Sequence, residues 1–375
     1  MCFRSESMMD MQAFQHQVCW LRERFPWMGS YSGYDVLCDY VQEISNSSHI
    51  SVYRPSKLAL PGVMNRIIEK ALRSFKKSKT YDAKGLAAEI YAVIHLIRKS
   101  IDITHVLYVE RTLGLLPYIT PKIRGKLVGT VHQPPLLWQN GRHHVDMLKD
   151  LSALIVLSKE SADFFEQFLP GRVYFVPHGI DTMFFQPERT LNGRVKREKP
   201  PRCVFSGAWL RDIEVLSKVI IEVLRRNKSC MFDLLIPKQQ RKDPHFEKLY
   251  SYEQVCWHEN LSDSQMRELY QNASILLLPI KECTANNALL EAMACGLPVV
   301  SNNVGGLRDY TREDFAKLLP VGDVEGMVEA VFSLTSDREL CILKGLKARS
   351  FVEKNFNWGK IARDTVEVYR KVTLD

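Results

Sequence analysis

The sequence predicts an α/β protein made of two Rossmann-like domains, each built on a parallel β-sheet. Three observations lead to this fold class. Short apolar runs rich in β-forming residues alternate with runs of helical spacing along most of the chain. These runs provide about twice as many strands as one small sheet needs. A polar, basic segment bracketed by prolines separates them into two sets, and 375 residues are enough for two domains.

The apolar runs place the elements in order along the chain. The first set of strands is predicted at residues 104–110, 126–132, 153–158 and 173–179. The second set is predicted at residues 202–208, 231–237, 274–280 and 298–302. Helical spacing indicates helices at residues 159–169, 212–226, 262–272 and 285–295, and another from about Tyr34.

The proline-bracketed segment at residues 187–202, PERTLNGRVKREKPPR, reads as a linker between domains. We therefore expect a first domain at residues 1–188, a linker at 189–199 and a second domain at 200–356. Ligands of open parallel sheets bind beyond the carboxyl ends of the strands. The turns that follow the strands are thus the place to look for function.

Composition is that of a soluble globular protein, with 46% hydrophobic and 25% charged residues. No apolar stretch reaches the roughly 20 residues that span a bilayer, and the N-terminus lacks the pattern of a secretory signal. Nine cysteines without a C-x-x-C pair favour reduced thiols in a cytoplasmic protein over disulfides or a zinc site.

The net charge of +8 is concentrated in residues 51–100, which hold eleven Lys/Arg and three Asp/Glu. The densest part, Arg66 to Lys79, has apolar residues at helical spacing with the basic residues largely opposite. Such a helix can lie on an anionic membrane at the cytoplasmic face, or it can be an ordinary surface helix with a solvated basic face. No nucleic-acid-binding motif accompanies it, so we expect no nucleic-acid partner.

Two strand-end turns of the first domain carry candidate residues. Gly29 and Gly33 bracket small polar residues before a helix, a pattern that lets an anion approach the backbone, although a plain turn also explains it. His132 ends a strand before two prolines and can donate to a sugar hydroxyl or to a developing charge; the alternative is a histidine satisfied within its own loop. We expect His178 to belong to a structural corner.

The second domain supplies the other candidates. Gly207 ends its first strand, and Arg211 opens the next helix, where it can clamp phosphate oxygens or form a salt bridge with Asp212. If residues 284–287 begin the helix 285–295, its first-turn N–H groups favour a diphosphate. Glu291 shares a helix face with Asn287 and can accept both hydroxyls of a ribose; the alternative is a surface carboxylate.

These turns, in this order, resemble the retaining glycosyltransferases of family 4, which have the GT-B fold. The most specific piece is LLEAMACGLPVVSNNVGG, residues 289–306, followed by FVPHGIDTMFF at residues 175–185. The segment FPWMGSYSGYD, residues 25–35, resembles the glycine-rich loop of one branch of the family. The C-terminal helix at about 357–375 resembles the closing helix that crosses back to the first domain.

The resemblance implies a role for each matching residue. Glu291 would bind the nucleotide ribose, His132 would lie at the reaction centre, and Arg211 would neutralise the diphosphate. Cys283 stands where the family usually has its first glutamate, and Glu282 lies one position earlier, so either can take that place. Ala208 replaces a frequent arginine. The remaining donor-binding candidates are Gly29, Gly33, Gly207, Thr284, Ala285, Asn286, Asn287 and Ala288.

We therefore expect transfer of a hexose from a nucleotide sugar to a hydroxyl of a glycan or lipid-linked acceptor, with retention of configuration. No cofactor is expected, and no metal site, because we find no DxD-like pair of carboxylates suited to Mg²⁺ or Mn²⁺ between the domains. Two alternatives stay open at this point. One is a nucleotide-sugar epimerase of similar fold, and the other is an inactive sugar-nucleotide-binding scaffold, suggested by Cys283.

Overall fold

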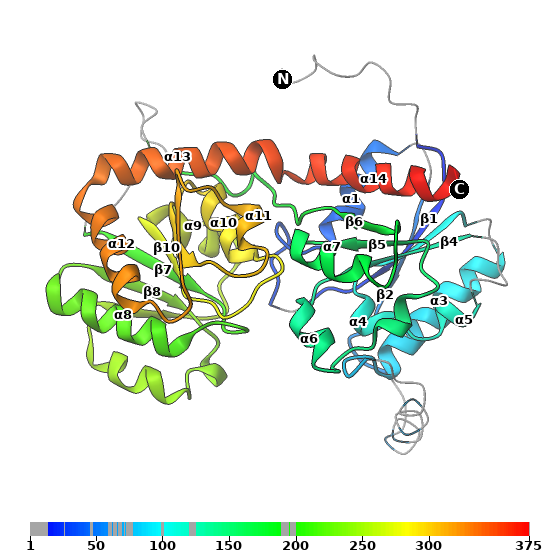
Figure 1. Ribbon diagram of the computed structural model, residues 1–375, viewed down its shortest axis with the longest axis horizontal. Helices are drawn as coiled ribbons and strands as arrows, with labels where there is room; N and C mark the ends of the chain where they lie inside the picture. Colours follow the sequence, from blue (N-terminus) through cyan, green and yellow to red (C-terminus); the bar gives the residue numbers. More distant parts are fainter. Residues whose placement is uncertain are drawn as a thin grey trace, which may run out of the picture.

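The computed structural model describes residues 14–25, 27–45, 48–58, 62, 66, 70, 72, 78–98, 101–119, 125–188, 195 and 200–374. They form two six-stranded sheets with helices on both faces, one in each half of the molecule (Figure 1). Every pairing between the named strands is parallel. The predicted α/β class with two parallel sheets is confirmed.

The first sheet has the strand order β2-β1-β3-β4-β5-β6. Its strands are β1 (Val18–Arg22), β2 (Ile50–Tyr53), β3 (Ile103–Val106), β4 (Lys126–Val131), β5 (Ala153–Val156) and β6 (Val173–Phe175). The α-helices described around it are α1 (Val36–Ile44), α3 (Ala83–Arg98), α4 (Val109–Thr112), α5 (Leu116–Ile119), α6 (Pro135–Gln139) and α7 (Lys159–Glu166), with a 3-10 turn, η2 (Val145–Leu148).

The second sheet has the order β12-β11-β10-β7-β8-β9. Its strands are β7 (Arg202–Ser206), β8 (Met231–Leu235), β9 (Val255–His258), β10 (Ile275–Leu278), β11 (Val299–Asn302) and β12 (Ala316–Leu319). The helices are α8 (Ile213–Arg226), η3 (Lys238–Gln240), η4 (Pro244–Ser251), α9 (Asp263–Asn272), α10 (Asn287–Ala294), α11 (Leu307–Tyr310), α12 (Val324–Ser336) and α13 (Arg338–Asn355).

Some predicted boundaries were wrong, and four strands were missed. The run 104–110 leaves the sheet after Val106 because residues 109–112 turn into α4. The helix predicted at 285–295 begins at Asn287, since the Asn286 side chain caps it by accepting from Leu289 N at 3.1 Å. The missed strands are short and interrupted by polar residues or Cys, which hides them from an apolar pattern: β1, β2, β9 and β12.

The last helix, α14 (Trp358–Leu374), joins the far end of the chain to the first sheet. Figure 1 shows α13 and α14 running end to end across both halves of the molecule. The α14 residue Tyr369 bonds through its hydroxyl to Trp20 Nε1 at 3.2 Å and to His105 Nδ1 at 2.7 Å. We propose that α14 belongs with residues 1–188 and that the second domain spans 200–356. Of the predicted linker at 189–199, only Val195 lies within the described residues.

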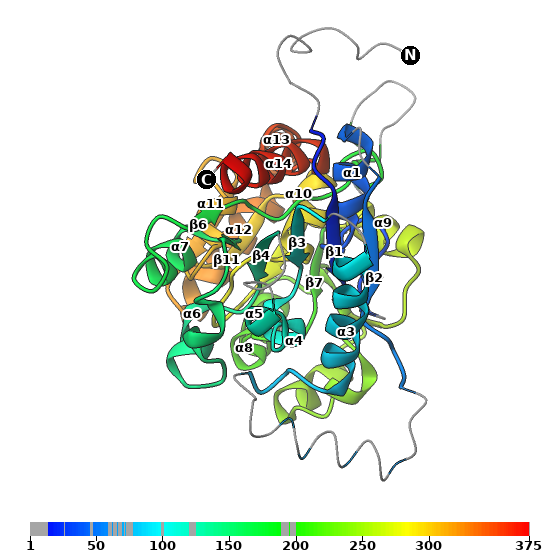
Figure 2. The same ribbon diagram turned by 90° about the vertical axis from the view of Figure 1, so that its right-hand side faces the viewer.

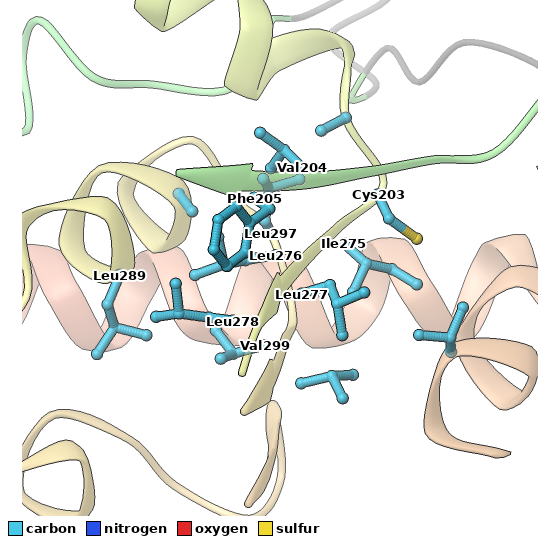
Figure 3. Packing of buried hydrophobic residues seen from close by; sticks show 14 of the residues in the cluster. Cys203, Val204, Phe205, Ile275, Leu276, Leu277, Leu278, Leu289, Leu297 and Val299 are labelled. Carbon is cyan, nitrogen blue, oxygen red and sulfur yellow. The ribbon is translucent and has the colours of Figure 1, made fainter. Parts of the chain in front are cut away.

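A large apolar core fixes the second sheet. Buried side chains of β7, β10 and β11 pack with Leu289 of α10 in one cluster (Figure 3). The whole stretch from Ala288 to Ala294 is buried, so α10 is covered on all sides. A helix held in this way presents its N-terminus at a fixed place beyond the strand ends.

Two sequence predictions concern membranes. No helix in the described part of the chain is long and apolar enough to span a bilayer. The basic segment Arg66 to Lys79 lies largely outside the described residues, so its amphipathic character stays a prediction.

Candidate functional site

Each sheet has one point at which the strand order reverses. The loops beside these two points are the candidates for binding a ligand. The reversal lies between β1 and β3 in the first sheet and between β7 and β10 in the second. Parallel sheets bind ligands in the crevice that opens there, beyond the carboxyl ends of the strands. The loops after β1 and β3 include the glycine loop 25–34 and residues 107–110. Those after β7 and β10 include Arg211 and residues 282–286.

His132 follows β4 and is half-buried in the first domain. Its ring stacks on Tyr108 with centroids 4.1 Å apart and meets Tyr34 edge-on at 4.7 Å. Its Nε2 is 2.8 Å from Leu107 O. Burial lowers the pKa of His132 to about 3, with a smaller contribution from His178, so the ring is neutral at physiological pH.

The hydrogen bond to Leu107 determines what His132 can do. A carbonyl oxygen only accepts, so Nε2 carries the single N–H of the neutral ring and donates it to Leu107 O. The other nitrogen, Nδ1, is then an acceptor. We expected His132 to donate a hydrogen bond to a sugar hydroxyl. In this arrangement Nδ1 can instead accept a hydrogen bond from a hydroxyl.

Glu110 is a residue that the sequence reasoning missed. It is buried, and Oε1 accepts from the backbone N–H groups of His132 and Gln133, both at 2.8 Å. Burial raises the pKa of Glu110 to about 7, while these N–H groups act in the opposite direction. The carboxylate holds the loop after β4 and thereby the backbone of His132. An acidic residue at the end of a predicted strand was the signal that could have identified it.

Arg211 lies at the reversal point of the second sheet. Its guanidinium donates to Ser206 O at 3.0 Å through Nε and to Asn286 Oδ1 at 3.4 Å through Nη2. It forms no ion pair within the described residues, and Asp212 instead caps α8 by accepting from Val215 N at 3.2 Å. The alternative of a salt bridge with Asp212 is therefore wrong, and the charge of Arg211 is available for an anion.

Gly207 makes this placement possible. Its φ is +88°, a conformation that side-chain-bearing residues rarely adopt, and a Cβ there would lie 3.0 Å from Arg211 Nη2. The guanidinium therefore lies over bare backbone where β7 ends. Ala208, which follows, is half-buried and packs against the core of the second domain.

The loop after β10 separates the two candidates for the first glutamate of the family pattern. Cys283 is buried in the apolar core, and burial raises the pKa of its thiol to about 12. Glu282 is half-buried, and its Oε1 accepts from Cys283 N at 2.7 Å. Of the two candidates for the first-glutamate position, Glu282 is therefore the one whose side chain can act as a carboxylate. Burial raises the pKa of Glu282 as well.

Two glycines let another loop lie against this one. Gly306 N donates to Cys283 O at 2.8 Å. A Cβ on Gly305 would lie 2.0 Å from Cys283 O, and one on Gly306 would lie 1.8 Å from Thr284 O. The backbone of the turn after β11 is therefore pressed onto residues 283–284. The buried Thr284 Oγ1 has no hydrogen-bond partner among the described residues.

The first turn of α10 meets Arg211 on one side and the first domain on the other. Asn286 is the residue that both caps the helix and bonds Arg211. The N–H groups of Asn287 and Ala288 donate to no backbone carbonyl within the described residues. Asn287 Nδ2 donates to Ser32 O at 3.1 Å. Ala285 packs against the cores of both domains.

Glu291 lies one turn deeper in α10 and is only 4% exposed. It accepts from the Tyr270 hydroxyl at 2.9 Å. Burial raises its pKa, whereas Ser32 and Tyr270 lower it. The alternative of a surface carboxylate is wrong, because the first domain's loop and α9 cover this face of α10.

The glycine loop reaches across to the second domain. Ser30 N donates to Asp263 Oδ2 at 3.2 Å, and a Cβ on Gly29 would lie 2.4 Å from Asp263 Oδ1. A Cβ on Gly33 would lie 3.0 Å from Asp35 Oδ1. Tyr31 stacks on Phe184 with centroids 3.7 Å apart. A side chain at position 29 would therefore press on Asp263, so Gly29 serves a contact between domains in addition to any ligand contact.

A cavity of about 520 Å³ opens where the two domains meet. It lies between the start of α7 and the turn after β11, and Lys159 N donates to Asp309 Oδ2 across it at 2.8 Å. Its lining holds four carboxylates and two cationic side chains. The lining residues are Lys159, Glu160, Asp163, Glu282, Asn303, Val304, Gly305, Arg308 and Asp309.

No group of three or more His, Cys, Asp or Glu side chains that could hold a metal ion occurs in the part of the chain that the structure describes. His178 bonds its Nδ1 to Gly179 O at 2.7 Å and lies buried between Tyr34 and Trp358. His178 therefore packs in the corner between β6 and the glycine loop, as predicted for a structural residue. The independence from metal predicted above stays a prediction.

Comparisons with known proteins show which proteins the chain resembles. Residues 200–337 match the protein family described as Glycosyl transferases group 1. The chain is 26% identical to the MMP alpha-(1->4)-mannosyltransferase of Mycolicibacterium hassiacum over 351 residues, 85% of this chain and 81% of that protein. It is 32% identical to the alpha-maltose-1-phosphate synthase of Mycolicibacterium smegmatis, over only 32% of this chain and 33% of that one.

Solved structures resemble the whole chain. The sucrose-phosphate synthase of Thermosynechococcus elongatus superposes with a TM-score of 0.73 at 16% identity, covering 96% of this chain and 99% of that one. The Anabaena protein HepE, solved with UDP and glucose, gives 0.68 at 13% identity and covers 95% and 100%. These likenesses establish the GT-B fold. The family model and the sequence relatives indicate a glycosyltransferase.

Proposed function

We propose that the chain is a retaining glycosyltransferase of family 4 that moves a hexose from a UDP- or GDP-sugar to a hydroxyl of a glycan or lipid-linked acceptor. The reaction needs no metal ion or other cofactor. The observation that carries this proposal is Arg211, a cation without an acidic partner in the described residues, bonded to the cap of α10 at the reversal point of the second sheet.

The diphosphate of the donor belongs at Arg211 and α10. The guanidinium can give two N–H bonds to phosphate oxygens, and the first turn of α10 adds the N–H groups of Asn287 and Ala288. Gly207 leaves the backbone open beside them. This arrangement stabilises the negative charge that develops on the leaving diphosphate, which is the role a metal ion takes in other enzymes.

The ribose role of Glu291 requires a movement. Its carboxylate is covered by the glycine loop, which is held by Asp263 and Asn287 of the second domain. We infer that the described arrangement is a closed one and that the loop leaves α10 to admit the nucleotide. Domain opening and closure of this kind also exclude water from the donor.

The acidic cavity suits hydroxyl groups better than phosphate. Four carboxylates and two cations repel a diphosphate but accept hydrogen bonds from sugar hydroxyls. We therefore propose that the donor hexose and the acceptor hydroxyl bind between the domains, at this cavity and at His132. Glu282 reaches it from the second domain, and His132 Nδ1 accepts from a hydroxyl on the other side.

The proposed transfer step accounts for every bond and proton without a metal ion. The bond between C1 of the hexose and the phosphate oxygen breaks, and its electron pair stays on the diphosphate. The acceptor oxygen bonds C1 from the same face, and its proton passes to a phosphate oxygen of the leaving group. Arg211 and the α10 amides stabilise the diphosphate, while His132 and Glu282 orient the sugar.

Equilibrium binding of UDP and GDP tests the diphosphate site. Arg211→Ala should weaken binding of the preferred nucleotide by at least roughly tenfold, because a charge-assisted contact is lost. Arg225→Ala is a matched control, since Arg225 is exposed on α8 and forms an ion pair with Glu222 at 2.8 Å. Equal affinity of both variants and the parent protein would contradict the assignment. Absence of any nucleotide binding would contradict the proposed donor site as a whole.

A further inference from the structure

Helix α3 exposes an apolar stripe at the outer surface of the first domain. Ile90, Tyr91, Ile94 and Ile97 are 45%, 60%, 36% and 71% exposed. Ile90, Ile94 and Ile97 are spaced by four and three residues, so they follow one another along a single helix face. Large apolar side chains gathered on one exposed face mark a surface that contacts another apolar phase.

The fold of α3 does not depend on this stripe. Its opposite face packs Ala88, Ala92 and Leu96 into the core of the first sheet. The helix is further fixed by Glu89, whose carboxylate accepts from the N–H groups of Gly114, Leu115 and Leu116 and from the Tyr81 hydroxyl. The outer isoleucines therefore have no structural task within the described residues.

The exposed charged residues of α3 itself are basic. Glu89 is the only acidic residue of α3, and it is buried. The basic residues of α3 that reach the surface are Arg98, which is exposed, and Lys84 and His95, which are partly exposed. The region of sequence from 51 to 100 has eleven Lys/Arg and three Asp/Glu, including the basic segment that leads into this helix. A surface that complements these basic residues and the apolar stripe is anionic on the outside and apolar inside.

Neighbouring elements leave the stripe accessible from outside. Figure 2 looks onto the end of the molecule that carries α3, far from the second domain in Figure 1. The short helix α5, whose first turn is bound by Glu89, exposes Tyr118 to 54%. A tyrosine with an apolar ring and a polar tip suits the boundary between headgroups and acyl chains.

We propose that the outer face of α3 docks the protein on an anionic lipid bilayer. The stripe Ile90, Tyr91, Ile94 and Ile97 enters the headgroup region, and the surrounding cations bind lipid phosphates. This differs from the donor site in residues and location, so it goes beyond the proposed transfer and stands or falls separately. It places the active protein at the surface where a lipid-linked acceptor would be found.

Vesicle flotation with the full chain tests this proposal. The protein should float with phosphatidylcholine vesicles that contain phosphatidylglycerol, and less with phosphatidylcholine alone. The double variant Ile94→Glu/Ile97→Glu should lose at least about fivefold of the bound fraction, because two carboxylates replace apolar contacts. Leu343→Glu on α13, where Leu343 is 53% exposed, is the matched control and should bind like the parent.

Measurements of folding and of oligomeric state complete this test. Unchanged melting temperature and nucleotide binding of the double variant show that it is folded. Equal flotation of the double variant and the parent, or no flotation of the parent on anionic vesicles, would overturn the proposal. A lipid-free parent that is dimeric while the double variant is monomeric would also overturn it, because the stripe would then join two copies of the chain.

Discussion

Asn287, in the first turn of α10, donates through Nδ2 to the carbonyl oxygen of Ser32, 3.1 Å away in the glycine loop of the other domain. The same loop bonds Asp263 at the start of α9. Both contacts lie over Glu291, and they join the two halves of the molecule at the proposed nucleotide site. A single loop thus links domain closure to the burial of the carboxylate that we assign to the ribose.

The first prediction concerns Gly29. Substitution by alanine places a Cβ 2.4 Å from Asp263 Oδ1, so either the Asp263 side chain or the loop must shift and their contact is disturbed. We expect Gly29→Ala to lower kcat by roughly tenfold, since a closed site is needed to exclude water and assemble the groups. Steady-state kinetics measure this. Gly29→Ala/Asp263→Ala should recover part of the loss because the clash is removed; no recovery would assign Gly29 to ligand contact alone.

Glu110 offers a second prediction. Glu110→Ala leaves the N–H groups of His132 and Gln133 without their acceptor and loosens the loop after β4. The expected result is a fall in kcat with little change in the KM of the donor, because the diphosphate contacts lie in the other domain. Unaltered kcat in a variant of native melting temperature would show that the loop is held by other contacts.

The third prediction separates Glu282 from Cys283. The thiol of Cys283 is buried and un-ionised, with a pKa of about 12, so Cys283→Ala should keep most of the activity. Glu282→Gln should lose most of it, because a carboxylate that faces the cavity becomes neutral. Parallel assays of the transferase activity of the two variants test this prediction. The reverse order of activities would place the first-glutamate function at Cys283.

A fourth prediction uses the buried His105, which bonds Tyr369 and Thr130 in its neutral form. Burial lowers its pKa to about 3. Above pH 6.5 neither the folded nor the unfolded chain holds this proton. Below it the unfolded chain binds a proton that the folded chain refuses, so the free energy of unfolding falls as the pH falls toward 3.

At pH 4.5 this group alone accounts for roughly 2–3 kcal/mol of lost stability relative to pH 7. His105→Gln keeps neutral hydrogen bonding and removes the titration. Its free energy of unfolding, measured with urea at both pH values, should therefore fall less than that of the parent. An identical fall in the two proteins would mean that His105 is protonated in the folded state.

Much of the fold followed from local patterns, whereas the site depended on contacts between distant segments. The alternation of strands and helices predicted both sheets, and the helix pattern located Arg211, Asn286 and Glu291. That Arg211 bonds Asn286, and not the adjacent Asp212, depends on the order of strands β7 and β10, which periodicity does not encode. The burial of Glu291 depends on a loop from the other domain.

Three further positions have structural partners that the sequence did not indicate. Glu110 was read as part of an apolar strand, although its carboxylate binds the backbone of the next strand's loop. His132 was expected to donate, and only its bond to Leu107 O shows which nitrogen holds the proton. Gly29 was assigned to a ligand, while its close neighbour is Asp263 of the second domain. Sequence predicts residue types at a site better than it predicts their partners.

The most direct test of the proposed donor site is thermal stabilisation by UDP-, GDP-, ADP- and TDP-sugars in the presence of a chelator. One nucleotide class should raise the melting temperature by several degrees. The rise should vanish in Glu291→Ala and persist in Glu329→Ala, a control on the exposed face of α12. Stabilisation by no donor, or an equal rise in Glu291→Ala, would contradict the assignment of a nucleotide-sugar site at α10.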